Sequence, residues 1–224
     1  MMKRTSHGAA DGVTGSKHLI EFAGSRILLD CGLFQGLKLH RERNWQAIPF
    51  DVGSLDAVVL SHAHLDHSGF LPVLVKHGYR GPVYASTATR DLADVLLRDS
   101  AHLQEEDSRR ANRYGSSKHG KALPLYTGAD AVRALQRITP LAAGRSAQVG
   151  RVEVSLTPVG HLLGANAITL GRRPRAHRLF GRPRPPARPV AAAARAHRPR
   201  RRAADRSHLR QSPASARRCA GDPR

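Results

Sequence analysis

Three histidines and one aspartate fall within six residues in the segment Ser61-His-Ala-His-Leu-Asp-His-Ser-Gly69. The segment follows residues 55–60, whose apolar side chains predict a buried strand. A strand that ends there releases these four side chains into a loop, from which they can reach two adjacent metal ions. Imidazole suits zinc, and a carboxylate adds the negative charge that a second divalent ion needs. The alternative is a solvated polar turn, but turns use Gly, Asn, Asp and Ser rather than three histidines.

The length and the cysteine content narrow the class of protein. A chain of 224 residues can form one sizeable domain, or one domain with a tail. Its two cysteines, Cys31 and Cys219, give no disulfide framework, which favours a reducing compartment. No apolar run is long enough for a membrane span, and the first residues lack the hydrophobic segment of a signal peptide. We therefore expect a soluble cytoplasmic protein without membrane association.

The positive charge is concentrated at one end of the chain. The formal net charge is +20, but residues 172–224 hold 17 of the 37 basic side chains and only two acidic ones. The first 171 residues are therefore only mildly basic. The charge distribution thus points to a separate basic tail rather than to a basic domain.

The first 171 residues alternate strand-like runs with helical patterns. We expect strands at residues 19–22, 26–30, 57–60, 82–85, 152–158 and 167–170. Helices are expected at 70–76, 87–114 and 129–138, the long one with an apolar face formed by Leu92, Val95, Leu96 and Leu103. This mixture predicts an α/β layered domain. Residues 172–224 are rich in Arg, Pro and Ala without apolar periodicity, so we expect them to be a disordered tail.

The motif His62-Ala-His64-Leu-Asp66-His67 resembles the signature of the metallo-β-lactamase fold. Three other segments resemble the β-CASP branch of that fold, whose members are RNA-processing nucleases: residues 8–16, 28–36 and 99–107. The resemblance covers residues 5–171 almost continuously. It implies an αββα sandwich, of which residues 1–171 would form the N-terminal part, and a zinc-dependent hydrolysis of RNA phosphodiester bonds.

The resemblance also implies a set of metal ligands. His62, His64 and His161 would bind the first of two Zn²⁺ ions, and Asp66 and His67 the second. Two ions about 3.5–4 Å apart turn a bridging water into a hydroxide that attacks phosphorus in line. Asp30 would bind neither metal but would orient the imidazoles that do. The alternative is that Asp30 only forms a turn at the end of a strand. Cys31, beside it, is expected to be a small buried side chain rather than a nucleophile.

Several elements of the family pattern do not occur in this sequence. The aspartate of a Ser-Gly-Asp-Leu-Gly motif, which bridges both metals in the family, is absent as written. The inserted β-CASP domain, a later histidine ligand and the general-acid histidine are absent too. We therefore expect a first site with three histidines, and a second site that keeps only Asp66 and His67 and binds metal weakly.

The basic tail has two interpretations. One is an arginine-rich arm that binds RNA phosphates. The other is a changed reading frame in a GC-rich gene, because Arg, Pro and Ala are typical products of such genes out of frame. Read one base later, permitted codons for residues 179–186 give Phe-Ser-Gly-Asp-Leu-Gly-Arg-Pro, and those for 206–212 give Glu-Ala-Thr-Tyr-Gly-Asn-Arg. Both restored segments resemble family motifs in the correct order, so we favour the changed frame; the nucleotide sequence around codons 171–179 would decide.

Three functions follow as hypotheses. The first is an RNA phosphodiesterase acting on single-stranded RNA. The sequence does not determine its oligomeric state, and a homodimer is one alternative. Its groove would use Arg109, Arg110, Arg113, Lys118 and His119, although charged residues on a long helix are usually a solvated face. The second is a catalytically impaired fragment of such a nuclease, with apolar sheet surface left uncovered. The third is a hydrolase of a small ester or thioester with the same fold, against which the β-CASP-like segments argue.

Overall fold

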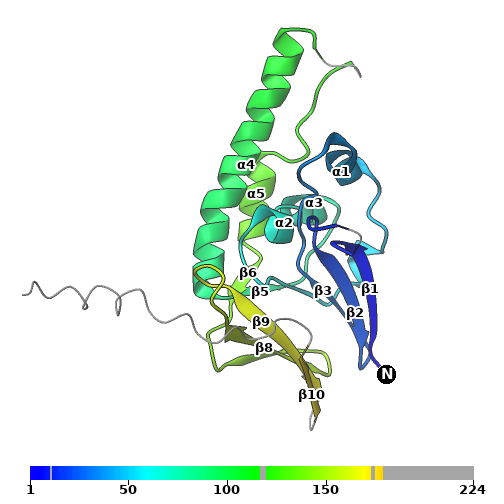
Figure 1. The fold of residues 1–224 in the computed structure, drawn as a ribbon, viewed down its shortest axis with the longest axis vertical. Coiled ribbons are helices and arrows are strands. Elements are labelled where there is room, and N and C mark those ends of the chain that lie inside the picture. The colour runs from blue at the N-terminus through cyan, green and yellow to red at the C-terminus, as the bar shows by residue number, and fades with distance from the viewer. Residues whose placement is uncertain (11, 117–119, 173–174, 179–224) are drawn as a thin grey trace, which may run out of the picture. The chain divides into compact units, whose positions relative to one another are not determined.

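The structure of the protein is a computed structural model that describes residues 1–10, 12–116, 120–172 and 175–178. All of these residues belong to one compact unit, Met1–Ala187. Within it, two β-sheets and a layer of helices enclose two apolar cores (Figure 1).

The first sheet contains six strands in the order β1-β2-β3-β4-β5-β6. The antiparallel part joins β1 to β2 and β2 to β3, and the parallel part runs from β3 to β6. Because β3 and β4 are parallel neighbours, their carboxyl ends meet at one edge of the sheet, where Asp30 and Ser61 follow them. The strands are Lys3–Gly8 (β1), Lys17–Phe22 (β2), Ser25–Leu29 (β3), Ala57–Val59 (β4), Val83–Ala85 (β5) and Ile138–Pro140 (β6).

Helices cover one face of this sheet. Their core contains Val58 and Val83 from the sheet together with Leu74 and Leu97 from the helices, all almost fully buried. The long helix α4 begins after Ser86, whose hydroxyl caps the Thr89 amide. The helices are Lys38–Glu42 (α1), Leu65–Ser68 (α2), Leu71–Lys76 (α3), Thr87–Arg113 (α4) and Gly128–Leu135 (α5), with single 3₁₀ turns at Arg43–Trp45 (η1) and Val52–Ser54 (η2).

The second sheet packs on the other face of the first. Its antiparallel strands follow the order β10-β9-β8-β7, with bounds Ser146–Val149 (β7), Val152–Pro158 (β8), Asn166–Arg172 (β9) and Arg175–Arg178 (β10). Val154 and Ile168 face Ile27 in the core between the sheets. The alternate side chains of β8 are Glu153, Ser155 and Thr157, so this strand presents a polar outer face. Helices, first sheet and second sheet form the expected α/β architecture of the N-terminal part of an αββα sandwich.

Several element boundaries differ from the expectation. The helix expected to reach residue 138 ends at Leu135, and Ile138 begins β6 instead. Pro140 restricts Thr139 to extended backbone, which favours a strand. Two polar edge strands, β1 and β7, carry little apolar signal and were not expected. The metal motif is partly helical, because α2 spans Leu65–Ser68 where we expected a loop.

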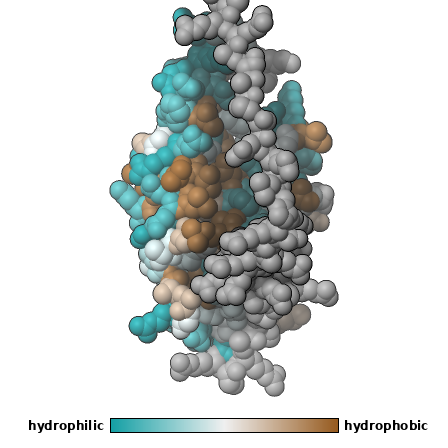
Figure 2. Space-filling view, turned by 60° about the vertical axis from the view of Figure 1, so that its left-hand side comes forward, coloured by the Kyte–Doolittle hydropathy of each residue, from teal (hydrophilic) through white to brown (hydrophobic). Residues whose placement is uncertain are grey.

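The expected helix 87–114 is confirmed almost to its ends by α4, but its apolar face is only partly as expected. Leu92 and Leu96 pack against the core, whereas Val95 and Leu103 are 62% and 52% exposed. The buried positions are smaller or polar: Thr89, Ala93, Leu97, Ser100 and Ala101. Figure 2 shows a strip of apolar surface on the side of the molecule that carries α4.

The basic segment 172–224 is described only at its start. β9 continues to Arg172, and β10 pairs with it through Arg175–Arg178. The disorder expected for residues 172–224 stays a prediction, because this short pairing does not test it. Residues 179–224 lie outside the described residues. In the part of the chain that the structure describes, no helix is long and apolar enough to cross a membrane.

Candidate metal centre

The metal loop, residues 61–69, is held by backbone hydrogen bonds from two other segments. The Ser16 amide donates to the Asp66 carbonyl (2.8 Å), Cys31 to His67 (2.7 Å) and Leu33 to Leu65 (2.8 Å). This close approach requires a glycine at position 32. A Cβ added there would lie 1.6 Å from the Asp66 carbonyl oxygen. Backbone contacts from two other segments therefore hold the loop that carries the motif.

Three histidines converge at this edge of the first sheet. His62 and His64 come from the metal loop, and His161 comes from the loop between β8 and β9. One ligand nitrogen from each lies within 4.8 Å of the other two. The His62 Nε2 and His64 Nδ1 atoms are 3.1 Å apart. Tetrahedral zinc with Zn–N bonds of about 2.0–2.1 Å holds its ligand nitrogens roughly 3.3 Å apart, so the arrangement fits such an ion.

The loop that presents His161 is docked onto the beginning of α4. The Gly164 carbonyl accepts hydrogen bonds from the Ser86 hydroxyl (2.8 Å) and the Thr89 hydroxyl (2.7 Å). Gly164 has a φ of +83°, and an added Cβ would lie 2.5 Å from the Thr89 amide nitrogen. Only glycine adopts this conformation so close to the helix without strain.

We expect Gly164→Ala to weaken zinc binding by about tenfold, because overpacking moves the loop that carries His161. Gly160→Ala is the matched control: it lies in the same loop, has no atom within 4 Å of its added Cβ and has no positive φ. Zinc affinity is measured by competition with a chromophoric chelator. Equal affinities for the two variants would show that this docking does not position His161.

The Asp30 carboxylate connects β3 to two of the histidines. It is 3% exposed and accepts hydrogen bonds from the Ser61 amide (2.7 Å), the Ser61 hydroxyl (2.9 Å) and His67 Nδ1 (2.8 Å). Asp30 adopts a φ of +57°, which aspartate tolerates better than most residues. Ser61 and His67 lie 31 and 37 residues after Asp30, so these contacts are not those of a local turn.

These hydrogen bonds fix which ring nitrogens carry protons. Because a carboxylate only accepts, His67 Nδ1 donates to Asp30, and in the neutral ring Nε2 then keeps its lone pair. The Ser61 hydroxyl gives its proton to Asp30, so it accepts from His62 Nδ1 at 2.9 Å. The Nε2 atom of His62 is then also a lone-pair donor. One buried carboxylate thus prepares two imidazoles for metal binding, directly and through Ser61.

The pKa values of His62 and His67 are shifted in opposite directions. Burial and the neighbouring His67 lower the pKa of His62 to about 4, so its ring is neutral at pH 7. Burial also opposes the charged form of His67, but the hydrogen bond to Asp30 and the charges of Asp30 and Asp66 outweigh it and raise the pKa. The Asp66 Oδ2 atom lies 3.6 Å from His67 Nε2, so these two potential ligands are neighbours.

Two residues near the site were missed by the sequence interpretation. Ser61, which links Asp30 to His62, could have been noticed because it directly precedes the motif. His18 in β2 is 2% exposed, its Nδ1 lies 2.9 Å from the Ser6 hydroxyl, and burial lowers its pKa. Its sequence neighbourhood gave no separate signal. Cys31 is fully buried, which raises its pKa to about 12 and makes it a poor nucleophile.

The expected basic groove is only partly described. Arg109, Arg110 and Arg113 line a shallow hollow of about 400 Å³ near the end of α4, together with Glu106 and Asp107. The two acidic side chains reduce its positive charge. Lys118 and His119 lie outside the described residues.

A family model described as the metallo-beta-lactamase superfamily matches residues 11–140, which include the whole metal loop. The chain belongs to this superfamily. Among its similar relatives is Ribonuclease TTHA0252 of Thermus thermophilus, 39% identical over 164 residues, or 73% of this chain and 34% of the relative. Transcription termination factor FttA of Methanocaldococcus jannaschii is 32% identical over 70% of this chain and 23% of the relative. Endoribonuclease ysh1 of Aspergillus fumigatus is 28% identical over 70% and 17%. The chain thus spans about a third or less of the length of these superfamily relatives.

Proposed function

We propose that this chain is part of a zinc-dependent hydrolase of the β-CASP branch that cleaves RNA phosphodiester bonds. The convergence of three imidazoles at the carboxyl edge of the parallel strands carries this proposal. Two of the relatives are named as ribonucleases, which favours RNA over a small ester or thioester as the substrate.

In this proposal some of the described residues bind the metal ions, and others position those ligands. His62, His64 and His161 hold the first zinc, and Asp66 and His67 contribute to the second. When bound, zinc supplies a water of lowered pKa as the nucleophile and neutralises charge on the phosphate. His62 is neutral at pH 7 and therefore binds zinc without first losing a proton. Asp30 keeps the lone pairs of His62 and His67 available, and Ser61 transmits its effect to His62.

Single-stranded RNA is the proposed partner. Its phosphates would contact basic side chains such as Arg109, Arg110 and Arg113, and such contacts weaken as salt is added. A cytoplasmic location and a homodimer remain part of the proposal.

A second candidate function is a catalytically impaired product that binds one zinc. The observation that favours it concerns the second site. Among the described residues, the three-histidine group is the one set whose ligand atoms converge on a single ion, and Asp66 and His67 alone give a weak site.

Both candidates bind one zinc tightly, so metal content tests the three-histidine site and cleavage separates the two candidates. We expect the purified chain to bind one zinc tightly by elemental analysis, and to cleave labelled single-stranded RNA slowly. Asp66→Ala should abolish that cleavage, whereas Asp91→Ala, on the exposed side of α4, should leave it unchanged. One zinc without cleavage would favour the impaired product. Cleavage that survives Asp66→Ala would contradict the proposed metal mechanism.

A further inference from the structure

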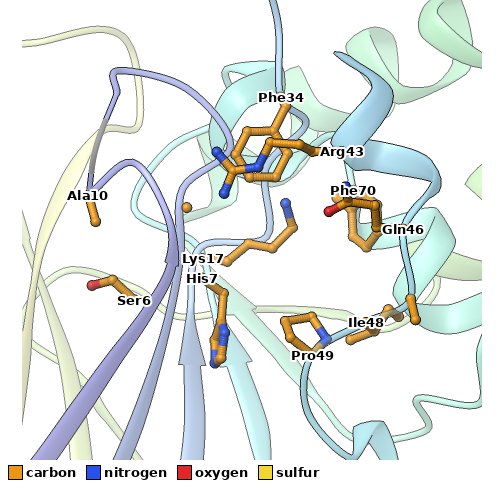
Figure 3. A pocket seen from close by; sticks show the side chains of 12 residues that line it. Ser6, His7, Ala10, Lys17, Phe34, Arg43, Gln46, Ile48, Pro49 and Phe70 are labelled. Atoms are coloured by element: carbon orange, nitrogen blue, oxygen red, sulfur yellow. The ribbon is translucent and has the colours of Figure 1, made fainter. Parts of the chain in front are cut away.

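Lys17, at the start of β2, is a charged residue in the interior of the protein. It is 5% exposed, and Figure 3 shows its ammonium group between the rings of Phe34 and Phe70. The Nζ atom lies 4.5 and 4.4 Å from the two ring centres and donates a hydrogen bond to the Gly32 carbonyl. Within the described ranges, no carboxylate forms an ion pair with it. Two aromatic faces and one carbonyl group therefore hold this ammonium.

The charge of Lys17 is a cost that packing alone does not explain. Burial and the neighbouring Arg43 lower its pKa to about 8, so the group is still mostly charged at pH 7. Lysine is among the residue types that are least often buried, and a buried charge without an anionic partner is costly for the fold. A methionine would fill a similar volume without that cost. The position of the ammonium therefore points to a role for the charge itself.

The hydrogen bond of Lys17 acts on a peptide group that also contacts the metal loop. The Gly32 carbonyl and the Leu33 amide belong to one planar peptide group and point in opposite directions. On one side the carbonyl accepts from Lys17, and on the other side the amide donates to the Leu65 carbonyl at 2.8 Å. Leu65 is the first residue of α2, the helix that carries the proposed ligands of the second ion. A single peptide group thus joins the ammonium to the backbone of the metal loop.

The other backbone group of Gly32 is held by the same part of the chain. Its amide donates to the Ser16 carbonyl at 2.9 Å, so residues 16 and 17 together bind both the amide and the carbonyl. The residues on either side, Cys31 and Leu33, each donate to the metal loop. A cation bound to a carbonyl polarises the peptide group, which strengthens the hydrogen bond that the amide of that group donates.

We propose that Lys17 is a positioning residue, whose ammonium holds the peptide group between Gly32 and Leu33 so that the metal loop presents its ligands to zinc. This inference rests on the proposed function, since it concerns the ligands of the zinc ions. The charge of the side chain is what matters, because only the ammonium donates to the carbonyl. A methionine would pack between the same rings but would leave the buried carbonyl without its donor.

Amide hydrogen exchange in the metal-free protein tests this role without zinc or RNA. We expect Lys17→Met to raise the exchange rate of the Leu33 amide by at least about tenfold, the effect of losing a charged hydrogen bond. The Asp30 amide, which donates to β4, should change far less, whereas a merely structural role would raise both rates alike. Lys76→Met is the matched control, because the exposed Lys76 also donates to a backbone carbonyl.

Zinc affinity gives the second readout. His64, a proposed ligand of the first ion, directly precedes α2, so a shift of this helix moves that ligand too. In competition with a chromophoric chelator, Lys17→Met should bind zinc at least severalfold more weakly than the original chain, and Lys76→Met should bind it equally well.

A measurement on the original chain covers the case in which Lys17→Met fails to fold. Nitrogen NMR of the lysine side chains should show one ammonium group whose protons exchange slowly with water and lie close to the ring protons of Phe34 and Phe70. The inference is overturned if no ammonium group behaves in this way, if the Leu33 and Asp30 amides of Lys17→Met respond alike, or if its zinc affinity is unchanged. An original chain that binds no zinc would instead contradict the proposed function, and the Leu33 exchange rate would still decide whether Lys17 holds the metal loop.

Discussion

Gly32→Ala should destabilise the metal-free protein by about 3 kcal/mol and greatly weaken zinc binding, because overpacking against rigid backbone is costly. The added methyl group would lie 1.6 Å from the Asp66 carbonyl oxygen and 2.6 Å from the His67 amide nitrogen. Both atoms belong to backbone, so no side-chain rotation relieves the clash. The metal loop must move, and the hydrogen bonds from Cys31 and Leu33 are lost with it.

Chemical denaturation of the metal-free protein measures the change in stability, and chelator competition measures zinc affinity. Gly12→Ala is the control, since its added Cβ meets no atom within 4 Å and its φ is not positive. If Gly32→Ala kept both quantities at the level of Gly12→Ala, the metal loop would not depend on this contact.

The position of the candidate site could be predicted from the sequence because it depends on local signals. An apolar strand followed at once by the histidine motif places His62 and His64 at a strand end, and the structure has that arrangement. The long helix α4 was recognisable for the same reason, since its pattern extends over many turns. These features depend on neighbours in the sequence rather than on the tertiary fold.

The contacts that organise the site could not be predicted in this way. Asp30 meets Ser61 only because β3 and β4 pair in parallel with Leu29 beside Val59. Nothing local specifies that register. Lys17 is a similar case, because lysine is among the least buried residue types, yet packing between Phe34 and Phe70 covers it. Strand β7 could not be predicted from apolar periodicity, because an edge strand needs few apolar side chains.

Asp30→Asn should reduce zinc affinity by about 10–100-fold, the usual effect of removing a group that orients metal ligands. The asparagine side chain has nearly the same shape, so packing is preserved. The Ser61 amide donates to Oδ1, so the amide oxygen of asparagine takes that place. Its NH₂ group then replaces Oδ2 and faces both His67 Nδ1 and the Ser61 hydroxyl as a donor where the carboxylate accepts. The proton of His67 then moves to Nε2, and that nitrogen can no longer bind a metal.

The pH dependence of stability gives a second readout in the metal-free protein. The pKa of His67 in the folded state lies above its ordinary value, chiefly because Asp30 outweighs the effect of burial. This interaction stabilises the folded state fully below about pH 6.5, the ordinary histidine pKa, and is lost as the pH rises through the folded-state pKa. In Asp30→Asn that pH-dependent contribution should disappear.

Nitrogen NMR of the imidazole rings separates this positioning role from a merely structural one. We expect His67 to be protonated on Nδ1 in the original chain and on Nε2 in Asp30→Asn, with zinc affinity falling in parallel. Asp91→Asn, on an exposed carboxylate paired with Arg90, should change neither quantity. If the tautomer changed while zinc affinity stayed the same, His67 would not be a ligand of the tightly bound ion. If affinity fell while the tautomer stayed the same, Asp30 would act through the fold of the metal loop instead, because its carboxylate also anchors Ser61 at the start of that loop.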